Sequence, residues 1–501
     1  MTRFSKIGIN TTSADNAFLM NAGLIPLVEL YDAMGLPSVI NEKLHVRKDK
    51  GFSDSTQILS LALMQLAGGE TIDDLAHFKD SFSVPGNPVE IPSPGAARAY
   101  LNCFHNEEDD SRRGYGNAFV PKANEHLYGF SEVHYHIMRE LQKLRPIESV
   151  TLDQDATFIE TGVEGALRNY KGESSFEALN IYSPEYDMIV ATQFRDGNVP
   201  PGFGQLEQLK DVLEHLPDGV KKVYFRSDAA GYQVDLMKYC AVSDETRRFP
   251  VIDFTISCPV TKEFREAARS VPESEWSRIY KLLPDGTRLY TDQECADVPY
   301  FPNSLNHSRG EPEYRFIAIR EICNLPAHQA GKIRADDLQR ELDLEIAEAE
   351  RENENMKKLH LSAMADHIYK VFGLVTNLIE HDNRDLVLSH HERCGKSEEA
   401  HLVLKEELAG GHVISKRFGA SAAYWNVAVM TMSLNNILKR HFLPTEFRNA
   451  RPKKLRYRFY GMAGRFARHA RCVILKIFGC KGGAGLFVDA MKRIRLCFNL
   501  S

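Results

Sequence analysis

Acidic residues in two segments of the chain occupy positions from which they could bind a metal ion. Asp228 lies three residues after the apolar run 223–225, which predicts a buried strand, and a turn and a helical pattern come after it. In residues 150–158 strict alternation places Asp153 and Asp155 on one face of a strand and apolar residues on the other. Chemistry in α/β proteins gathers at the carboxyl ends of strands, which makes these carboxylates candidate metal ligands. An aspartate at the end of a strand, however, more often only caps the next helix.

A further acid, Glu398, lies in a segment that we expect to be helical from about Ser397 to the paired glycines at 410–411. Lys405 is seven residues beyond Glu398. At about 100° per residue the two side chains are roughly 20° apart on one helical face. Opposite charges at this spacing are common on exposed helices, so the pair indicates a site only in combination with the two aspartate-bearing strands.

The elements around these acids predict an α/β fold. Three strands come first, at residues 150–158, 176–182 and 188–194, and a helix follows at 204–216. The strand before Asp228 is expected at 221–227, a second helix at 233–240 and a further strand at 250–257. Another buried strand is expected at 371–378. This order predicts an RNase H-like mixed sheet with helices on both faces.

The flanking regions differ from this core in character. Ser53 and Ser93 are expected to cap helices, and a glycine pair at 68–69 ends the first of them, a spacing found in helix-turn-helix units. A turn at 284–286 predicts a hairpin, and a charge-dense helix is expected at 336–358. The predicted organisation begins with a helical, DNA-binding region (1–145) and the first part of the core (146–257). A β-rich insertion with the charged helix (258–370), the second part of the core (371–440) and a basic C-terminal region (441–501) follow.

Composition narrows the class of protein. The chain has 501 residues, of which 43% are apolar and 26% charged, as in folded globular proteins. No window approaches eighteen uncharged apolar residues, and the amino terminus lacks the apolar segment of a signal peptide. Nine scattered cysteines without a CxxC pair argue against a disulfide framework or a zinc site. We therefore expect a cytoplasmic protein that has no membrane partner.

The net charge of −6 means that any surface for nucleic acid must be local. Between Lys439 and Lys476 twelve lysines or arginines face a single acid, Glu446. Aromatic residues are interleaved with the basic residues of 448–471, which indicates either a DNA-binding surface or a basic helix lying on the protein's own surface.

Taken in order, several motifs resemble the core of insertion-sequence DDE transposases, above all the group with a β-rich insertion before the third acid. The motifs are VTLDQDATF, YKGESSFEALNIYSPEYDMIVATQFRDGNV, VYFRSDAAGY, and ERCGKSEEAHLVLKEELAGG followed by RFGASAAYWNVAVM. The resemblance covers roughly residues 149–439. Each motif is degenerate alone, and their order is what makes the resemblance specific.

This resemblance implies roles for individual residues. The first acid, followed two residues later by threonine, matches Asp155, with Asp153 as the alternative, and the second matches Asp228. Glu398 and Lys405 match the glutamate and lysine of the family's Y-x2-R-x3-E-x6-K box. The chain departs from that box elsewhere: Arg393 lies one residue too far from Glu398, and His390 stands in place of the tyrosine.

The implied chemistry is cleavage of donor DNA at terminal inverted repeats and joining of the ends to target DNA, by a homodimer on paired ends. Asp155, Asp228 and Glu398 would hold two Mg²⁺ ions, with Mn²⁺ as a substitute, because carboxylate oxygens suit these ions. Lys405 would contact the cleaved strand. No small-molecule substrate is implied. Two alternatives remain open: a metal-dependent nuclease that cuts without joining, and an inactive, domesticated DNA-binding protein.

Further DNA contacts are expected outside the three acids. The candidates are Arg98 in the helical region, Arg226 in the core, and Arg456 and Arg458 in the basic C-terminal region. Arg393 of the box is a further candidate. Trp276 in the insertion could stack on a base flipped out of the DNA, although a tryptophan in such a region is more often part of the core.

Overall fold

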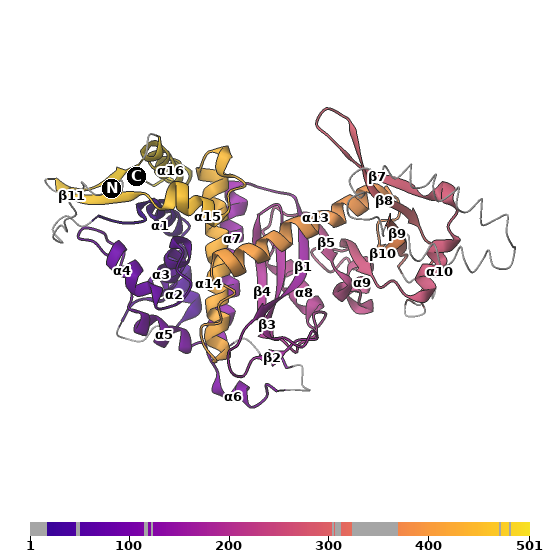
Figure 1. The fold of residues 1–501 in the computed structure, drawn as a ribbon, viewed down its shortest axis with the longest axis horizontal. Helices are drawn as coiled ribbons and strands as arrows, with labels where there is room; N and C mark the ends of the chain where they lie inside the picture. Colours follow the sequence, from indigo (N-terminus) through magenta and orange to yellow (C-terminus); the bar gives the residue numbers. More distant parts are fainter. Residues whose placement is uncertain are drawn as a thin grey trace, which may run out of the picture.

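The computed structural model describes residues 18–46, 51–114, 119–121, 124–302, 305, 312–322, 369–469, 472–479 and 482–500, and one mixed sheet of ten strands runs through its centre (Figure 1). In chain order the strands are β1 (Ser149–Glu160), β2 (Leu167–Arg168), β3 (Ser174–Ser183), β4 (Met188–Asp196), β5 (Lys222–Ser227), β6 (Asp253–Cys258), β7 (Ser277–Leu282), β8 (Arg288–Asp297), β9 (Arg315–Ile322) and β10 (Tyr369–Thr376). The charged helix predicted at 336–358 lies outside the described residues.

The order of strands across the sheet is β2-β3-β1-β5-β6-β10-β9-β8-β7, and β4 also pairs with β3. β1 is parallel to β5 and β5 to β6, while the other described pairs are antiparallel. The predicted α/β class with a large mixed sheet is therefore confirmed. The strands β7 to β9 of the predicted insertion continue the same sheet, because β10 joins them to β6.

Helices cover both faces of the sheet. The face that carries Arg226 is crossed by α13 (Asn383–Leu402), and Arg226 Nη1 donates to Ser389 Oγ at 3.3 Å. The opposite face is covered by α8 (Gln205–His215), where Gln154 Nε2 donates to the Gln205 carbonyl at 3.0 Å. Near α8 lies α9 (Val234–Ala241), and α10 (Lys262–Ser270) follows β6.

The N-terminal region is helical, as its sequence predicts. Its helices are α1 (Ile25–Ala33), α2 (Leu36–Leu44), α3 (Asp54–Ala67), α4 (Asp74–Phe82), α5 (Pro94–Asn102), α6 (Glu107–Asp110) and α7 (Glu125–Leu144). They pack around α14 (Phe418–Ile437), all twenty residues of which are buried. Because α14 also packs against β4, it joins this helical region to the edge of the sheet.

Helix caps explain where several of these helices begin and end. Ser53 Oγ accepts a hydrogen bond from the Thr56 amide at 3.2 Å at the start of α3, and Gly68 ends that helix at φ 101°. Ser93 caps α5 in the same way.

The sequence from 438 onward is not one basic helix. It forms α15 (Pro452–Leu455), the hairpin of β11 (Ala463–His469) and β12 (Cys472–Phe478), and α16 (Gly483–Cys497), with π-helical turns at Leu438–Phe442 and Arg456–Tyr460. Leu19 and Gly464 exchange two backbone hydrogen bonds of 2.8 Å. Both ends of the described chain therefore lie on the same helical region (Figure 1).

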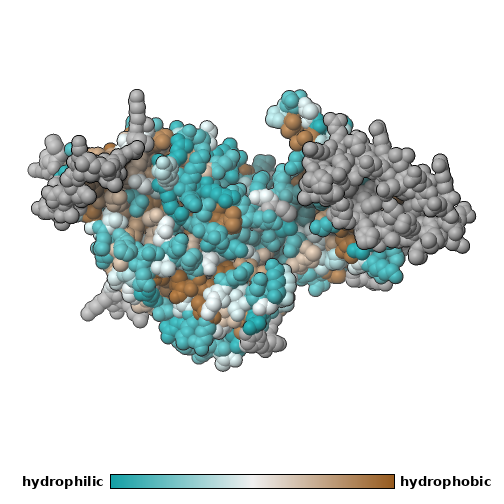
Figure 2. All heavy atoms as spheres, viewed as in Figure 1, coloured by the Kyte–Doolittle hydropathy of each residue, from teal (hydrophilic) through white to brown (hydrophobic). Residues whose placement is uncertain are grey.

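Among the described residues no single helix is long and apolar enough to cross a membrane, and only the bent pair Ala22–Ala33 with Leu36–Leu44 reaches that length and composition. The hairpin of β7 and β8 projects from the body of the molecule (Figure 1). Leu282 and Leu289 near its tip are exposed. Figure 2 shows brown, hydrophobic spheres on this projecting hairpin.

Candidate active site

The register between β1 and β5 brings two of the expected acids together. The parallel pairs run from Ser149 opposite Lys222 to Gln154 opposite Ser227. Asp155 and Asp228 are the next residue on each strand, and neighbouring strands are about 4.8 Å apart. Asp228 Oδ1 also accepts the Ala230 amide at 3.0 Å, so this carboxylate caps the turn after its strand as well.

The third acid is carried across the sheet by α13 (Figure 1). This helix begins at Asn383 and not near Ser397, where we expect it from the sequence, and Asp382 caps it by accepting the Asp385 amide at 3.2 Å. The buried residues of this helix are apolar at its start, where Leu386 and Val387 pack against strands β7 to β10. Farther along they are mostly polar and recur every three or four positions: His390, Arg393, Ser397 and His401. Because the buried residues change from apolar to polar, no continuous apolar stripe marks the helix, which is why the sequence misplaces its start.

Polar groups of the sheet meet this polar side of α13. His390 Nδ1 and Nε2 hydrogen-bond the hydroxyl groups of Thr255 and Ser257 on β6, at 3.1 and 3.0 Å. Arg393 Nη1 lies 3.5 Å from Asp155 Oδ2. The departures from the family box, at Arg393 and His390, are therefore positions where α13 is fixed to the sheet.

The three acids act on one another electrostatically. The pKa of Asp155 is raised to about 6, mainly because the carboxyl is buried, with the negative charges of Asp228 and Glu398 adding to the shift and Arg393 opposing it. Glu398 itself is exposed. Its neighbour Glu399 forms a salt bridge of 2.9 Å with Arg451. Glu398 is thus near enough to Asp155 to affect its pKa, whereas Glu399 has a separate partner.

Asp153, the alternative first acid, has a different role. Its side chain is fully buried and both oxygens accept from Arg226, Oδ1 from Nε at 2.5 Å and Oδ2 from Nη2 at 2.8 Å. Arg226 is 2% exposed. The DNA contact predicted for Arg226 does not fit this position, because its guanidinium is enclosed by the Asp153 carboxylate and α13.

Lys405 lies one π-helical turn beyond α13, in Val403–Glu407. Its half-buried Nζ donates to the Phe158 carbonyl on β1 at 3.3 Å. Lys405 therefore lies beside β1, the strand that carries Asp155, and π-helical turns are frequent at functional sites.

The remaining predicted DNA contacts fall into two groups. Arg98 and Arg458 are exposed, and each forms a salt bridge with one acid, Asp73 and Glu446 respectively. Arg456 instead donates to the Leu66 and Gln65 carbonyls at the end of α3, at 2.8 and 3.1 Å. A DNA contact does not fit Arg456, because it holds the C-terminal end of α3 to the π turn at Arg456–Tyr460.

Trp276 does not fit the base-stacking role. Its ring is partly buried against the core, and the Arg320 guanidinium lies 4.2 Å from the ring centroid. One face of the indole is therefore already covered by a cation.

A buried ion pair that the sequence does not reveal lies close to the two aspartates. Arg195 Nε donates to Glu177 Oε2 at 2.7 Å, and both side chains are 0% exposed. Burial raises the pKa of Glu177 to about 7, Arg195 opposes the shift, and the charges of Asp155 and Asp228 add to it. The signal was present in the sequence as charged residues within two apolar strands, β3 and β4.

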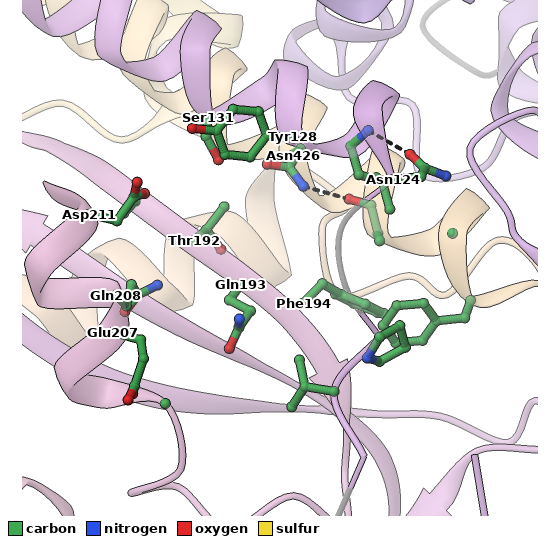
Figure 3. Close-up of a pocket in the computed structure, with 18 of the residues that line it drawn as sticks. Asn124, Tyr128, Ser131, Thr192, Gln193, Phe194, Glu207, Gln208, Asp211 and Asn426 are labelled. Carbon is green, nitrogen blue, oxygen red and sulfur yellow. Dashed lines mark hydrogen bonds between the residues drawn. The ribbon is translucent and has the colours of Figure 1, made fainter. Parts of the chain in front are cut away.

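A cavity of about 850 Å³ lies beyond the edge strand β4, away from the three acids. Figure 3 shows Glu207, Gln208 and Asp211 of α8 on one side of it and Thr192 and Gln193 of β4 on the other. Its described lining residues include acidic side chains and no lysine or arginine. This charge does not suit the binding of DNA phosphates.

Among the described residues, the group of His, Cys, Asp or Glu whose ligand atoms all lie within 4.8 Å of one another is His105, Glu107 and Asp110, and the carboxylates of Asp155, Asp228 and Glu398 are not that close together. The two acids already pair with arginines, Glu107 with Arg417 at 3.0 Å and Asp110 with Arg113 at 2.8 Å. Asp155, Asp228 and Glu398 have carboxylate oxygens, the ligand type that Mg²⁺ prefers.

Comparison with known proteins indicates the family of the chain. The family model described as "Transposase DDE domain group 1" matches residues 13–308, which include Asp155 and Asp228. No curated protein matches the chain. Among solved structures, a cryo-EM structure of the piggyBac transposase synaptic complex with hairpin DNA is similar at a TM-score of 0.41 and 9% identity, over 87% of this chain and 79% of that one. The family model covers more than half of the chain, and the chain therefore belongs to the DDE-domain transposases.

Proposed function

We propose that this chain is the transposase of an insertion sequence, which binds terminal inverted repeats, cuts the donor DNA and joins the ends to target DNA. The supporting observation is the position of Asp155 and Asp228, which directly follow the last paired residues of two parallel strands. The electrostatic effect of Glu398 on Asp155 adds the third acid. Such a set of acids at the carboxyl end of strands is the expected catalytic centre of an RNase H-like sheet.

The donor set fits a divalent metal. Three carboxylates supply only oxygen ligands, which Mg²⁺ prefers and Mn²⁺ accepts. The pKa of Asp155 is raised to about 6, mainly by burial, so its ionised form is unfavourable in the folded protein. A bound cation would stabilise that ionised form. When bound, a pair of such ions activates the attacking oxygen and stabilises the leaving oxygen of a phosphodiester.

The chain's own residues have distinct roles in this proposal. Asp155, Asp228 and Glu398 would hold the metal. Lys405 binds a phosphate of the cleaved strand, since its Nζ lies beside β1. Arg393, at 3.5 Å, holds the Asp155 carboxylate and is not freely available to DNA.

Binding of the transposon ends needs a surface beyond these residues. Arg98 and Arg458 are exposed basic residues on the helical region and the segment packed on it, and each has a single acidic partner that a phosphate could replace. By resemblance to the family, two copies of the chain would act together on paired ends.

Two neighbouring glutamates provide a matched test. Glu398 and Glu399 are both exposed on α13, and only Glu399 pairs with Arg451. Loss of a residue that supports a metal ligand typically costs roughly 10–100-fold in activity. We expect Glu398→Gln to reduce the rate of cleavage by more than this, and Glu399→Gln to have little effect. The assay is Mg²⁺-dependent nicking of a duplex that carries the inverted repeats found beside the gene.

The same assay separates the related functions. Pre-cleaved ends that are joined to a target plasmid support a transposase, whereas cleavage without joining identifies a nuclease. Equal activity of Glu398→Gln and wild type would show that the third acid is misassigned. Specific binding of the repeats without any cleavage would identify a DNA-binding protein that has lost its chemistry.

A further inference from the structure

A chain of hydrogen-bonding side chains connects α14 to the Asp155 carboxylate. Trp425 Nε1 donates to Thr192 Oγ1 at 2.7 Å, and Thr192 Oγ1 donates to Asn180 Oδ1 at 2.6 Å. Asn180 Nδ2 then lies 3.0 Å from His401 Nε2, and the other ring nitrogen of His401, Nδ1, lies 4.0 Å from Asp155 Oδ2. The chain crosses four elements, α14, β4, β3 and α13, before it reaches β1.

The direction of these hydrogen bonds follows from the chemistry of the first donor. An indole nitrogen can only donate, so Thr192 accepts from Trp425 and has its own hydroxyl proton left to give. Asn180 Oδ1 accepts that proton, which turns the amide group, Nδ2, toward His401. His401 Nε2 must then be the acceptor, and the single proton of a neutral imidazole is placed on Nδ1.

The reverse orientation is unfavourable at both ends. If Asn180 were turned the other way, the Thr192 hydroxyl would lose its acceptor on Asn180. His401 Nδ1 would then present a lone pair to the Asp155 carboxylate, which is repulsive. Trp425 is 0% exposed, Asn180 1% and His401 5%, so water does not easily replace these partners.

We propose that His401 is a positioning residue for the first metal ligand, with its proton fixed on Nδ1 by Trp425, Thr192 and Asn180 so that an N–H group faces Asp155 Oδ2. This inference rests on the proposed function, in which Asp155 holds a metal. Asp155 Oδ1 accepts the Ala156 amide at 3.0 Å, and Oδ2 faces Arg393 and His401. The carboxylate is thereby held from its own strand and from α13.

A neutral donor is useful at this position. Because Nε2 accepts the Asn180 amide, the ring carries a single proton and remains uncharged. His401 therefore orients the carboxylate without offsetting the negative charge that attracts a cation. Groups behind a metal ligand typically change metal affinity by about 10–100-fold when they are lost.

Two substitutions of His401 separate the donor from the bulk of the side chain. In His401→Asn the amide nitrogen can lie where Nδ1 lies, whereas in His401→Gln it reaches the position of Nε2. We expect His401→Gln to weaken Mn²⁺ binding by about 10–100-fold and His401→Asn to stay within about threefold of wild type. Binding is measured by calorimetry and by electron paramagnetic resonance on the full-length protein without DNA, after circular dichroism has shown that each variant is folded.

The far end of the chain gives an independent test. Thr192→Val removes the hydroxyl and should weaken Mn²⁺ binding, whereas Thr192→Ser keeps the hydroxyl and should not. In ¹⁵N spectra of histidine-labelled protein, the His401 signal, assigned by its loss in His401→Asn, should show a proton on Nδ1 in wild type and a mixture of tautomers in Thr192→Val.

Asp155→Asn distinguishes failure of this inference from failure of the proposed function. Unchanged Mn²⁺ binding by Asp155→Asn would overturn the metal site itself. If Asp155→Asn loses Mn²⁺ but His401→Asn and His401→Gln bind it equally well, His401 does not position the ligand. A wild-type spectrum with the proton on Nε2 would also overturn the inference.

Discussion

Asp155→Asn is predicted to make the metal-free protein more stable while it removes a metal ligand. The pKa of this carboxyl is raised from 3.8 to about 6, so the folded state disfavours its ionised form. The side chain is 17% exposed, and solvent screening is therefore limited. A shift of about 2.2 units at 1.36 kcal/mol each corresponds to about 3 kcal/mol at neutral pH.

The sign of this effect sets its pH dependence. A raised pKa means that the stability associated with protonated Asp155 is fully present below about pH 3.8 and is lost as the pH rises through about 6. Asparagine does not ionise. We therefore expect the gain in the free energy of unfolding from Asp155→Asn to grow from about 0.5 kcal/mol at pH 4 to about 3 kcal/mol at pH 7.

Urea denaturation in EDTA at both pH values measures this gain, and Asp153→Asn is the control. That substitution leaves Arg226 buried without its carboxylate partner, and we expect a loss of about 3–5 kcal/mol. Added Mg²⁺ should stabilise the wild type and not Asp155→Asn, because only the wild type keeps the full ligand set. A loss of stability in Asp155→Asn at pH 7, or a gain that is the same at both pH values, would refute the reasoning.

Two further predictions concern DNA and protons. Arg458→Ala should weaken DNA binding and reduce the slope of log K against log salt concentration by about 1. Arg456→Ala should leave that slope unchanged. It should lower the midpoint of urea unfolding, because Arg456 binds carbonyl groups at the end of α3. Fluorescence anisotropy at several salt concentrations measures the slope, and an equal change in both variants would contradict these positions. At pH 6 Mn²⁺ binding should release about half a proton from Asp155, and less at pH 8, because the carboxyl is half protonated near its pKa. Calorimetry in two buffers of different ionisation enthalpy measures this release, and a value that does not change with pH would count against it.

The sheet was predictable where apolar residues alternate or run together. Segments 176–182, 188–194 and 204–216 correspond closely to β3, β4 and α8. Asp228 could be placed because an apolar strand ends directly before it and a turn follows. These features depend on local pattern, which a sequence displays.

The parts that could not be predicted depend on partners far away in the chain. Arg226 and Arg456 are basic residues in promising positions, but the groups that bind them, Asp153 and the end of α3, are found only in the folded structure. The start of α13 was misplaced because the apolar residues Leu386 and Val387 are followed by buried polar residues, so that no continuous apolar stripe marks the helix. His401 was missed because its partner, Asn180 on β3, lies far away in the chain.

The long interval between Asp228 and Glu398 has a consequence during synthesis. A growing chain contains β1, β3, β5 and β6 well before α13 is made, and N-terminal parts of a chain fold first. Until α13 has left the ribosome, the aspartate pair lacks both its third acid and the helix that covers it. Under the proposed function, a truncated product that ends before Asn383 would lack the third acid and would not cleave DNA.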